Sequence, residues 1–164
     1  MIKPYLTALS KLIGVPVDKL KLVREVTDVQ WKKSYPEVKE DDEYFKPDMG
    51  YGARLRPYQV RDGNDTIVTS FGLYEFPSCC AFVVSTQAFV DPRYRGKKVN
   101  KLTNKLRQNI ASALGYTAII CTDVDDNVAE RATLAAEGWK DIYQVRNKRT
   151  GNLVNISVKE LKNG

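Results

Sequence analysis

The fold of this chain is decided by the stretch Ala88-Phe-Val-Asp-Pro-Arg-Tyr-Arg-Gly-Lys-Lys-Val-Asn-Lys-Leu102, in which an apolar segment gives way to a basic one. The segment that leads into it, Cys80 to Val90, is rich in β-branched and aromatic residues. We expect it to form a central strand whose two faces are both largely covered. Apolar side chains then recur at intervals of three and four residues, which predicts a helix over residues 98–114.

The residues on either side extend this unit into an α/β domain. Gly115 ends the predicted helix and residues 116–122 form a second buried strand, so the strand, helix and strand imply a right-handed parallel crossover. Around it we expect helices over 4–13, 28–35 and 128–137, strands over 20–26, 51–60 and 66–76, and a hairpin of strands 139–145 and 153–158. The predicted fold class is α/β, with a mixed, mostly antiparallel sheet around a central parallel strand-helix-strand crossover.

Length and composition exclude several classes of protein. The chain has 164 residues, which predicts a single domain over residues 1–164. It contains no histidine, so neither a Ser-His-Asp nor a Cys-His catalytic system can form within it, and the commonest catalytic zinc sites are excluded as well. The longest apolar run, Cys79 to Val84, falls far short of the roughly 20 residues that span a bilayer.

The cysteines and the N-terminus favour a cytoplasmic protein. The three cysteines are an odd number without C-x-x-C spacing, so we expect reduced thiols and no metal site. Pro4 and polar residues interrupt the N-terminal segment, which does not resemble a secretory signal.

Positive charge gathers at the start of the predicted helix over 98–114. The net charge is +6, and one stretch without any acid contains seven cations: Arg93, Arg95, Lys97, Lys98, Lys101, Lys105 and Arg107. A helix start already presents positive potential through its free backbone N–H groups, so these cations oppose the helix dipole. A bound anion such as a phosphate group would offset both. The alternative is a solvated lysine-rich surface, because charge runs usually indicate exposure.

The same stretch resembles the acetyl-CoA signature of the GNAT superfamily of N-acetyltransferases. In that family an apolar strand is followed by Pro and two further residues. The motif Arg/Gln-x-x-Gly-x-Gly/Ala then begins a long helix. Pro92, Arg95 and Gly96 keep this frame. A later motif of the family, an Asn before a helix that ends in Gly-Phe, is similar to Asn127 and Gly138-Trp139. The resemblance identifies residues 51–158 as a cofactor-binding core and residues 1–50 as a variable N-terminal segment.

The resemblance implies that acetyl-CoA binds with its pyrophosphate over the helix start. The pyrophosphate loop would be formed by Arg95, Gly96, Lys97, Lys98, Val99 and Asn100. The backbone of Phe89 and Val90 would bind the pantetheine edgewise, and Asn127 would contact the cofactor arm. The implied reaction is direct attack of an amine, on a small molecule or a protein, on the thioester between splayed strands, in a monomer or homodimer.

The sequence departs from the family pattern at three positions. Lys98 and Asn100 stand where the two motif glycines belong, so we expect weaker or altered cofactor binding, which Lys98 could partly offset through a contact to phosphate. Leu134 stands where the family has a tyrosine as general acid, and leucine cannot donate a proton.

Two carboxylates are candidates for a catalytic base. Glu75 precedes the central strand, where the family sometimes positions a carboxylate, and Asp123 follows the second parallel strand at the edge where ligands bind in open sheets. A solvated glutamate near a turn and an aspartate in a turn or cap are the alternatives. Tyr94, Tyr116 and Tyr143 could supply a hydroxyl or serve in packing.

Three classes of function stay open on the sequence alone. The first is an acetyl-CoA-dependent N-acetyltransferase that acts on an unidentified amine. The second is an inactive GNAT-fold binding or structural protein, because residues 73–77 and 80–85 are similar to degenerate GNAT-like proteins of tailed phages, which would place it in the host cytoplasm or a virion. The third is nucleic-acid binding, for which the basic helix offers phosphate contacts but no means of reading bases. The acidic stretch Glu37 to Asp48 could attract a cationic amine or be a solvated loop.

Overall fold

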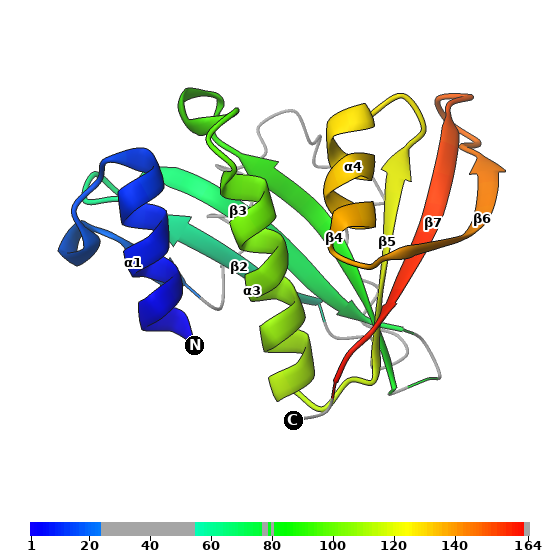
Figure 1. The fold of residues 1–164 in the computed structure, drawn as a ribbon, viewed down its shortest axis with the longest axis horizontal. Coiled ribbons are helices and arrows are strands. Elements are labelled where there is room, and N and C mark those ends of the chain that lie inside the picture. The colour runs from blue at the N-terminus through cyan, green and yellow to red at the C-terminus, as the bar shows by residue number, and fades with distance from the viewer. Residues whose placement is uncertain (24–54, 77–78, 80, 163–164) are drawn as a thin grey trace, which may run out of the picture.

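The computed structural model describes residues 1–23, 55–76, 79 and 81–162, which form a mixed seven-stranded sheet (Figure 1). The strand order is β1-β2-β3-β4-β5-β7-β6, and of these neighbouring pairs β4 and β5 run parallel while the others are antiparallel. The helices of the described part lie together on one face of the sheet (Figure 1). The predicted fold class is therefore confirmed. None of the helices in the described ranges is both long and apolar enough to span a membrane.

The elements lie close to their predicted positions. The strands are β1 (Lys21–Val23), β2 (Leu55–Arg61), β3 (Ile67–Glu75), β4 (Phe82–Val90), β5 (Ala118–Val124), β6 (Lys140–Arg146) and β7 (Leu153–Glu160). The helices are α1 (Ile2–Ile13), α3 (Val99–Ala113) and α4 (Val128–Ala136), with short 3-10 turns η1 (Val17–Lys19) and η3 (Pro92–Tyr94). The predicted helix over 28–35 and the strand segments 24–26 and 51–54 lie outside the described residues.

Strand β5 begins and ends two residues later than predicted. The Tyr116 N–H donates to the Ala111 carbonyl, 3.1 Å away, and so closes the end of α3. The Thr117 N–H donates to the Ala81 carbonyl at 2.9 Å just before the ladder to β4 starts. At its other end β5 continues to Val124 because β7 pairs with it along its whole length.

The core lies between the helices and the sheet. Tyr5, Leu9 and Ile13 recur at helical spacing on α1 and are buried, and α3 contributes Leu106 and Ile110 to the same cluster. Trp139 is 7% exposed and belongs to this cluster, whereas Trp31 lies outside the described residues.

Strand β4 is less covered than the sequence indicates. Val83 and Ser85 are buried, but Phe82 and Ala88 are exposed and the other β4 side chains are half-buried. The expectation that both faces are largely covered is therefore wrong for most of the strand. The described helices lie on one face of the sheet, so Phe82 and Val84 on the other face keep exposure although β5 pairs with them. Beyond Ser85, β4 also lacks β5 as a neighbour.

The turn into α3 holds a lysine in a conformation that favours glycine. Lys98, the residue before the first turn, has φ 62° and ψ 17°, and its side chain forms no capping hydrogen bond. This is one of the two positions where the resembled motif has glycine. The left-handed conformation costs an L-residue roughly 1–2 kcal/mol, so the backbone keeps the glycine geometry at the expense of strain.

We expect Lys98→Gly to stabilise the fold. Glycine removes the strain at φ 62° but gives the unfolded chain more freedom, so the net gain should be about 1 kcal/mol or less, or about 2–4 °C in Tm. Thermal unfolding followed by circular dichroism measures it. Lys97→Gly is the matched control, since Lys97 does not have positive φ and glycine there should lower Tm. A lower Tm for Lys98→Gly would contradict the strain argument.

Candidate functional site

Strands β4 and β5 separate halfway along the sheet. Their parallel ladder joins residues 82–85 to residues 118–121, with Ser85 opposite Cys121 as the last pair. Beyond this point β4 continues beside β3 and β5 continues beside β7, and Figure 1 shows the two halves of the sheet diverging. Gln87, with φ 56°, lies in an irregularity of the β3–β4 register that bends β4 in the same region.

The open side of β4 exposes the backbone of Val90. The Asp91 N–H donates to the Val68 carbonyl of β3 at 2.9 Å, and alternate residues of an antiparallel pair direct their backbone groups to opposite sides. Val90 therefore directs its backbone groups away from β3, toward the side that β5 has left. Its carbonyl accepts a hydrogen bond from Arg95 Nε at 3.0 Å. Phe89, the other residue expected to bind pantetheine, has its carbonyl bound by the Thr69 hydroxyl at 2.7 Å.

Asp91 stabilises the loop between β4 and α3 through hydrogen bonds from Arg93 within the same loop. The Asp91 carboxylate accepts hydrogen bonds from the Arg93 backbone N–H at 2.8 Å and from the Arg93 guanidinium at 3.0 and 2.9 Å. The Arg93 guanidinium holds the pKa of Asp91 below its usual value. Gly96, with φ 76°, completes the turn toward the helix.

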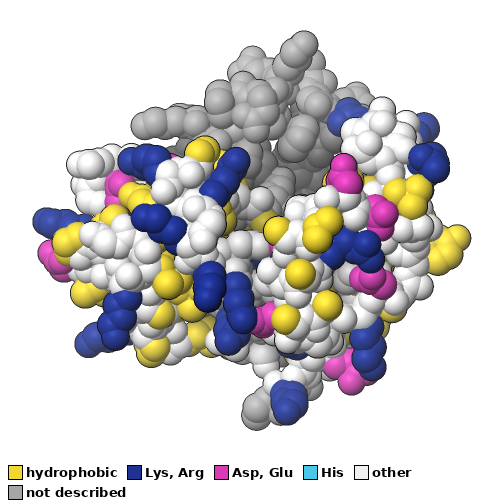
Figure 2. Space-filling model, turned by 45° about the horizontal axis from the view of Figure 1, so that its top comes forward, with side chains coloured by type: hydrophobic (Ala, Val, Ile, Leu, Met, Phe, Trp, Pro, Cys, Tyr) yellow, Lys and Arg dark blue, Asp and Glu magenta, His cyan; other side chains and the backbone are white. Residues whose placement is uncertain are grey.

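Most cations of the basic stretch are exposed and have no carboxylate partner among the described residues. Arg93 is exposed but paired with Asp91, and Arg107 is buried, so these two are set apart. The remaining five are exposed and have no carboxylate within 4.0 Å in the part of the chain that the structure describes: Arg95, Lys97, Lys98, Lys101 and Lys105. Lys and Arg side chains gather on the left of the face in Figure 2, over α1 and α3. The first turn of α3 contains no acid and has no side-chain cap, so its backbone N–H groups add to this positive potential.

A polar cluster lies where the two strands separate. Arg107 on α3 donates to the Ser85 hydroxyl on β4 at 2.9 Å, and its other terminal nitrogen lies 3.9 Å from the Glu130 carboxylate on α4. Glu130 also accepts a hydrogen bond from Asn100, a residue expected in the pyrophosphate loop. Asn104, one turn along α3, is fully buried.

Several buried polar atoms beside this separation have no hydrogen-bond partner among the described residues. They are both amide atoms of Asn104 and the Nε of Arg107. Buried polar groups are nearly always paired, so such a concentration calls for a further partner. A polar ligand or ordered water between α3, α4 and the separated strands would supply it.

Asp123 lies on the part of β5 that has left β4. Its side chain is 3% exposed, and the nearest cation is Arg131 of α4, with Nε 3.8 Å from the carboxylate. Burial raises the pKa of Asp123 above its ordinary value, and the carboxylate of Asp141 acts in the same direction. Arg131 also pairs with Asp125 at 3.0 Å and with Asp141 at 3.3 Å, so its charge is shared among three carboxylates.

Glu75 lies away from Asp123. It pairs in register with Val83, which pairs with Ile119, so Asp123 is four residues farther along β5, or about 13 Å. The Tyr116 hydroxyl donates to Glu75 at 2.7 Å and accepts a hydrogen bond from Arg56 at 3.2 Å. Burial and this contact with Glu75 raise the pKa of Tyr116. The structure therefore brings Asp123, but not Glu75, beside the separated strands.

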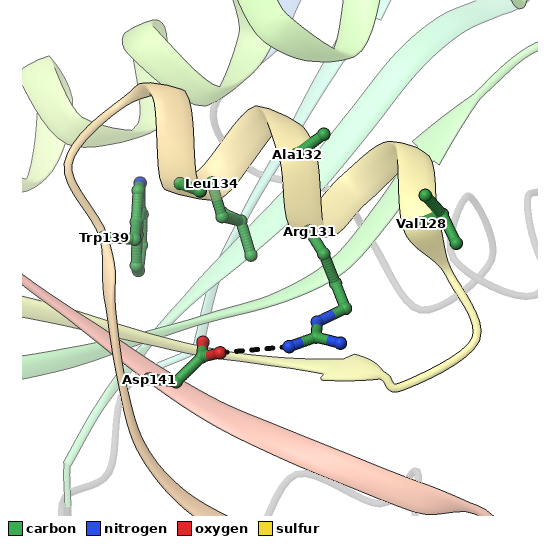
Figure 3. A pocket seen from close by; sticks show the side chains of 7 residues that line it. Val128, Arg131, Ala132, Leu134, Trp139 and Asp141 are labelled. Carbon is green, nitrogen blue, oxygen red and sulfur yellow. Dashed lines mark hydrogen bonds and ion pairs between the residues drawn. The ribbon is translucent and has the colours of Figure 1, made fainter.

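Asn127 and Leu134 lie on α4. The Asn127 side chain caps the helix by accepting a hydrogen bond from the Glu130 N–H at 3.2 Å. Leu134 is buried beside Trp139 and lines a pocket of about 380 Å³ between α4 and β6 (Figure 3). Figure 3 shows Arg131 reaching down from α4 to Asp141 at the other side of this pocket.

Sequence reasoning missed three residues of the polar cluster. Arg107 was counted with the other cations of the basic stretch, and neither Asn104 nor Glu130 was singled out. A signal was available for α3, because Asn100, Asn104 and Arg107 share one side of the helix and Arg107 lies beside buried apolar positions. No signal was available for Glu130, whose role depends on how α4 packs beside α3.

The opposite pKa shifts of two aspartates give a pH test of this geometry. Because the pKa of Asp123 is higher in the folded protein than in the unfolded chain, its ionisation lowers the free energy of unfolding. This loss is absent below the ordinary pKa of aspartate and complete above the pKa of Asp123 in the folded protein. Asp123→Asn should therefore raise Tm at pH 7 and lose this advantage as the pH falls. The pKa of Asp141 is lowered, first by its hydrogen bond from Ser157, so Asp141→Asn should lower Tm at pH 7 and matter less in acid. Differential scanning calorimetry at several pH values would contradict the assignment if both substitutions changed Tm in the same direction.

Comparison with known proteins places the fold. No family model and no curated protein sequence matches the chain. Solved structures do match: the ribosomal-protein-S18-alanine N-acetyltransferase of Escherichia coli has a TM-score of 0.67 at 11% identity and covers 87% of this chain and 94% of its own. The IAA acetyltransferase of Bacillus cereus has a TM-score of 0.65 at 12% identity, with 87% and 99% covered. Spermidine N-acetyltransferase of Vibrio cholerae, in complex with CoA and spermine, has a TM-score of 0.62 at 11% identity, with 89% and 98% covered. The chain has the fold of the GNAT-family N-acetyltransferases.

Proposed function

We propose that this protein binds acetyl-CoA at the start of α3 and between β4 and β5, and that it transfers the acetyl group to an amine. One observation carries the proposal: the parallel pair β4 and β5 separates at the end of the sheet where the uncapped start of α3 lies, with cations that have no carboxylate partner among the described residues. An elongated anionic ligand whose other end is polar but uncharged fits both features. The structural neighbours with the same fold support acetyl transfer, and one of them was solved with CoA and spermine.

The residues of the site fit such a donor. Arg95, Lys97 and Lys98 would bind the phosphates together with the free N–H groups of α3, since helix starts bind phosphate readily. The open side of Val90 and the unpartnered amide of Asn104 would bind the amide groups of the pantetheine arm. Bound acetyl-CoA supplies an acetyl thioester for attack by the amine.

Asp123 is the better placed of the two proposed bases. It lies beyond the separation of β4 and β5, and its raised pKa makes it a stronger proton acceptor than an exposed aspartate. We propose that Asp123 accepts the proton of the attacking amine, either directly or through one water. Glu75 is bound to Tyr116 at the other end of β4 and stays a prediction without support from this geometry.

The acceptor is assigned only as an amine. The residues that carry the proposal lie within 51–158, so we propose that these residues form the cofactor-binding core within a single domain.

The buried, apolar Leu134 favours the second candidate, a GNAT-fold protein that binds acetyl-CoA without turnover. The comparisons give no support to the predicted link with phages, and that link is not carried forward.

Calorimetric titration with acetyl-CoA tests the proposal. We expect saturable binding to the wild type, and Arg95→Ala should weaken it about tenfold to a hundredfold through loss of a charged hydrogen bond. The matched control is Arg146→Ala, because Arg146 also donates to a backbone carbonyl, that of Gly151 at 2.9 Å, but lies on β6. This control should bind like the wild type.

Two results would overturn parts of the proposal. The absence of heat and of thermal stabilisation up to millimolar acetyl-CoA would refute cofactor binding. Binding without release of free thiol, measured with a panel of polyamines, amino-terminal peptides and aminoglycosides, would favour the inactive candidate.

A further inference from the structure

We propose that Arg107 stabilises the thiolate that leaves during acetyl transfer, the step for which Leu134 offers no proton. This inference rests on the function proposed above and deepens it. A tyrosine would donate a proton to the departing sulfur, whereas a buried guanidinium would stabilise the sulfur as an anion.

The position of Arg107 carries the inference. Its side chain is 4% exposed, and it donates to the hydroxyl of Ser85, the last β4 residue that pairs with β5. Its Nε is buried and has no hydrogen-bond partner in the part of the chain that the structure describes. A guanidinium thus lies at the point where the strands separate, with one N–H left to meet an acceptor.

The charge of Arg107 is only partly balanced. The charged or titratable groups that act on it are Glu130 from α4, Cys121 from β5 and Tyr5 from α1. The Glu130 carboxylate is 3.9 Å away, at the limit of an ion pair, and it also binds Asn100. Burial lowers the pKa of Arg107, but arginine stays protonated near neutral pH, so a cation remains available.

Cys121 shows how this surrounding acts on a sulfur atom. It lies opposite Ser85 in the last pair of the ladder, beside the place where the strands separate. Burial raises the pKa of its thiol to about 12, and the carboxylates of Asp123, Glu130 and Asp141 act in the same direction, whereas the charge of Arg107 lowers it. Arg107 therefore favours a thiolate here, although burial and the carboxylates outweigh it at Cys121.

The reaction balances with this assignment. A C–N bond forms between the amine and the acetyl carbonyl carbon, and the C–S bond breaks. The bonding electron pair leaves on sulfur, where the Arg107 guanidinium stabilises it. The proton of the attacking amine passes to Asp123 or to water, and solvent later protonates the sulfur.

The pH dependence of ligand affinity tests the assignment without turnover. CoA and desulfo-CoA differ only in the thiol. The pH dependence of their affinity ratio therefore reports how binding changes the pKa of that thiol. We expect calorimetry to show that a rise in pH from about 6 to about 10 favours CoA over desulfo-CoA more in the wild type than in Arg107→Gln, by roughly tenfold for each unit by which the guanidinium lowers the thiol pKa. An equal change of the affinity ratio in the two proteins would overturn the inference.

Two further variants assign the effect to the guanidinium. In Glu130→Gln the rise in pH should favour CoA more than in the wild type, because the competing carboxylate is gone. Arg56→Gln is the matched control, since Arg56 is hydrogen-bonded to Tyr116 at the other end of the strands, and it should behave like the wild type. If Arg107→Gln does not fold by circular dichroism, Glu130→Gln decides, and a change of the ratio equal to or below that of the wild type refutes the role.

The two proposals fail in different ways. If neither CoA nor desulfo-CoA binds, the proposed function falls and the inference falls with it. If both bind and their affinity ratio changes equally in the wild type and in Arg107→Gln, acetyl-CoA binding stands and the role of Arg107 is refuted.

Discussion

The end of the β4–β5 ladder at Ser85 and Cys121 is the constraint on which the site depends. A continuous sheet would have paired the backbone of Val90 with β5 and left no room between the strands. The backbone groups that lose their partner there must find another one or water, since unpaired buried groups are costly. Arg95 satisfies one of them by donating to the Val90 carbonyl. The interruption therefore leaves backbone groups of β4 without a strand partner in the middle of the sheet.

The same interruption explains why the space between α3 and α4 is polar. Where helices cover a complete sheet, apolar side chains fill the gap, as Leu106 and Ile110 do on the rest of α3. Beside the separation, α3 instead presents Asn104 and Arg107, and α4 presents Glu130. Burying the charge of Arg107 and the Asn104 amide, which has no partner among the described residues, lowers the free energy of unfolding. Such a cost is typical of residues at ligand-binding sites, as proposed here for this cluster.

The strand-helix-strand unit and the hairpins could be predicted from the sequence because their signals are local. Apolar spacing located α3, and Gly115 marked its end. The polar cluster could not be predicted to the same degree, since the roles of Arg107 and Glu130 depend on the register between two helices. The sparse cover of β4 was missed for a related reason: its β-rich composition suits a central strand, but composition carries no information on where β5 departs. Asp123 could be singled out because the carboxyl ends of strands meet at one edge of an open sheet, and its catalytic role stays a prediction.

The replacement of an expected tyrosine by Leu134 and the presence of Arg107 form one argument about the leaving group. A phenol must lose its proton and regain it in each cycle, whereas a guanidinium keeps its charge throughout. Stabilisation by a fixed charge is strongest where water is excluded, and Arg107 is almost fully buried. The nearby Glu130 limits this effect by competing for the same cation, so its distance of 3.9 Å from Arg107 sets how much of the charge a departing sulfur can use.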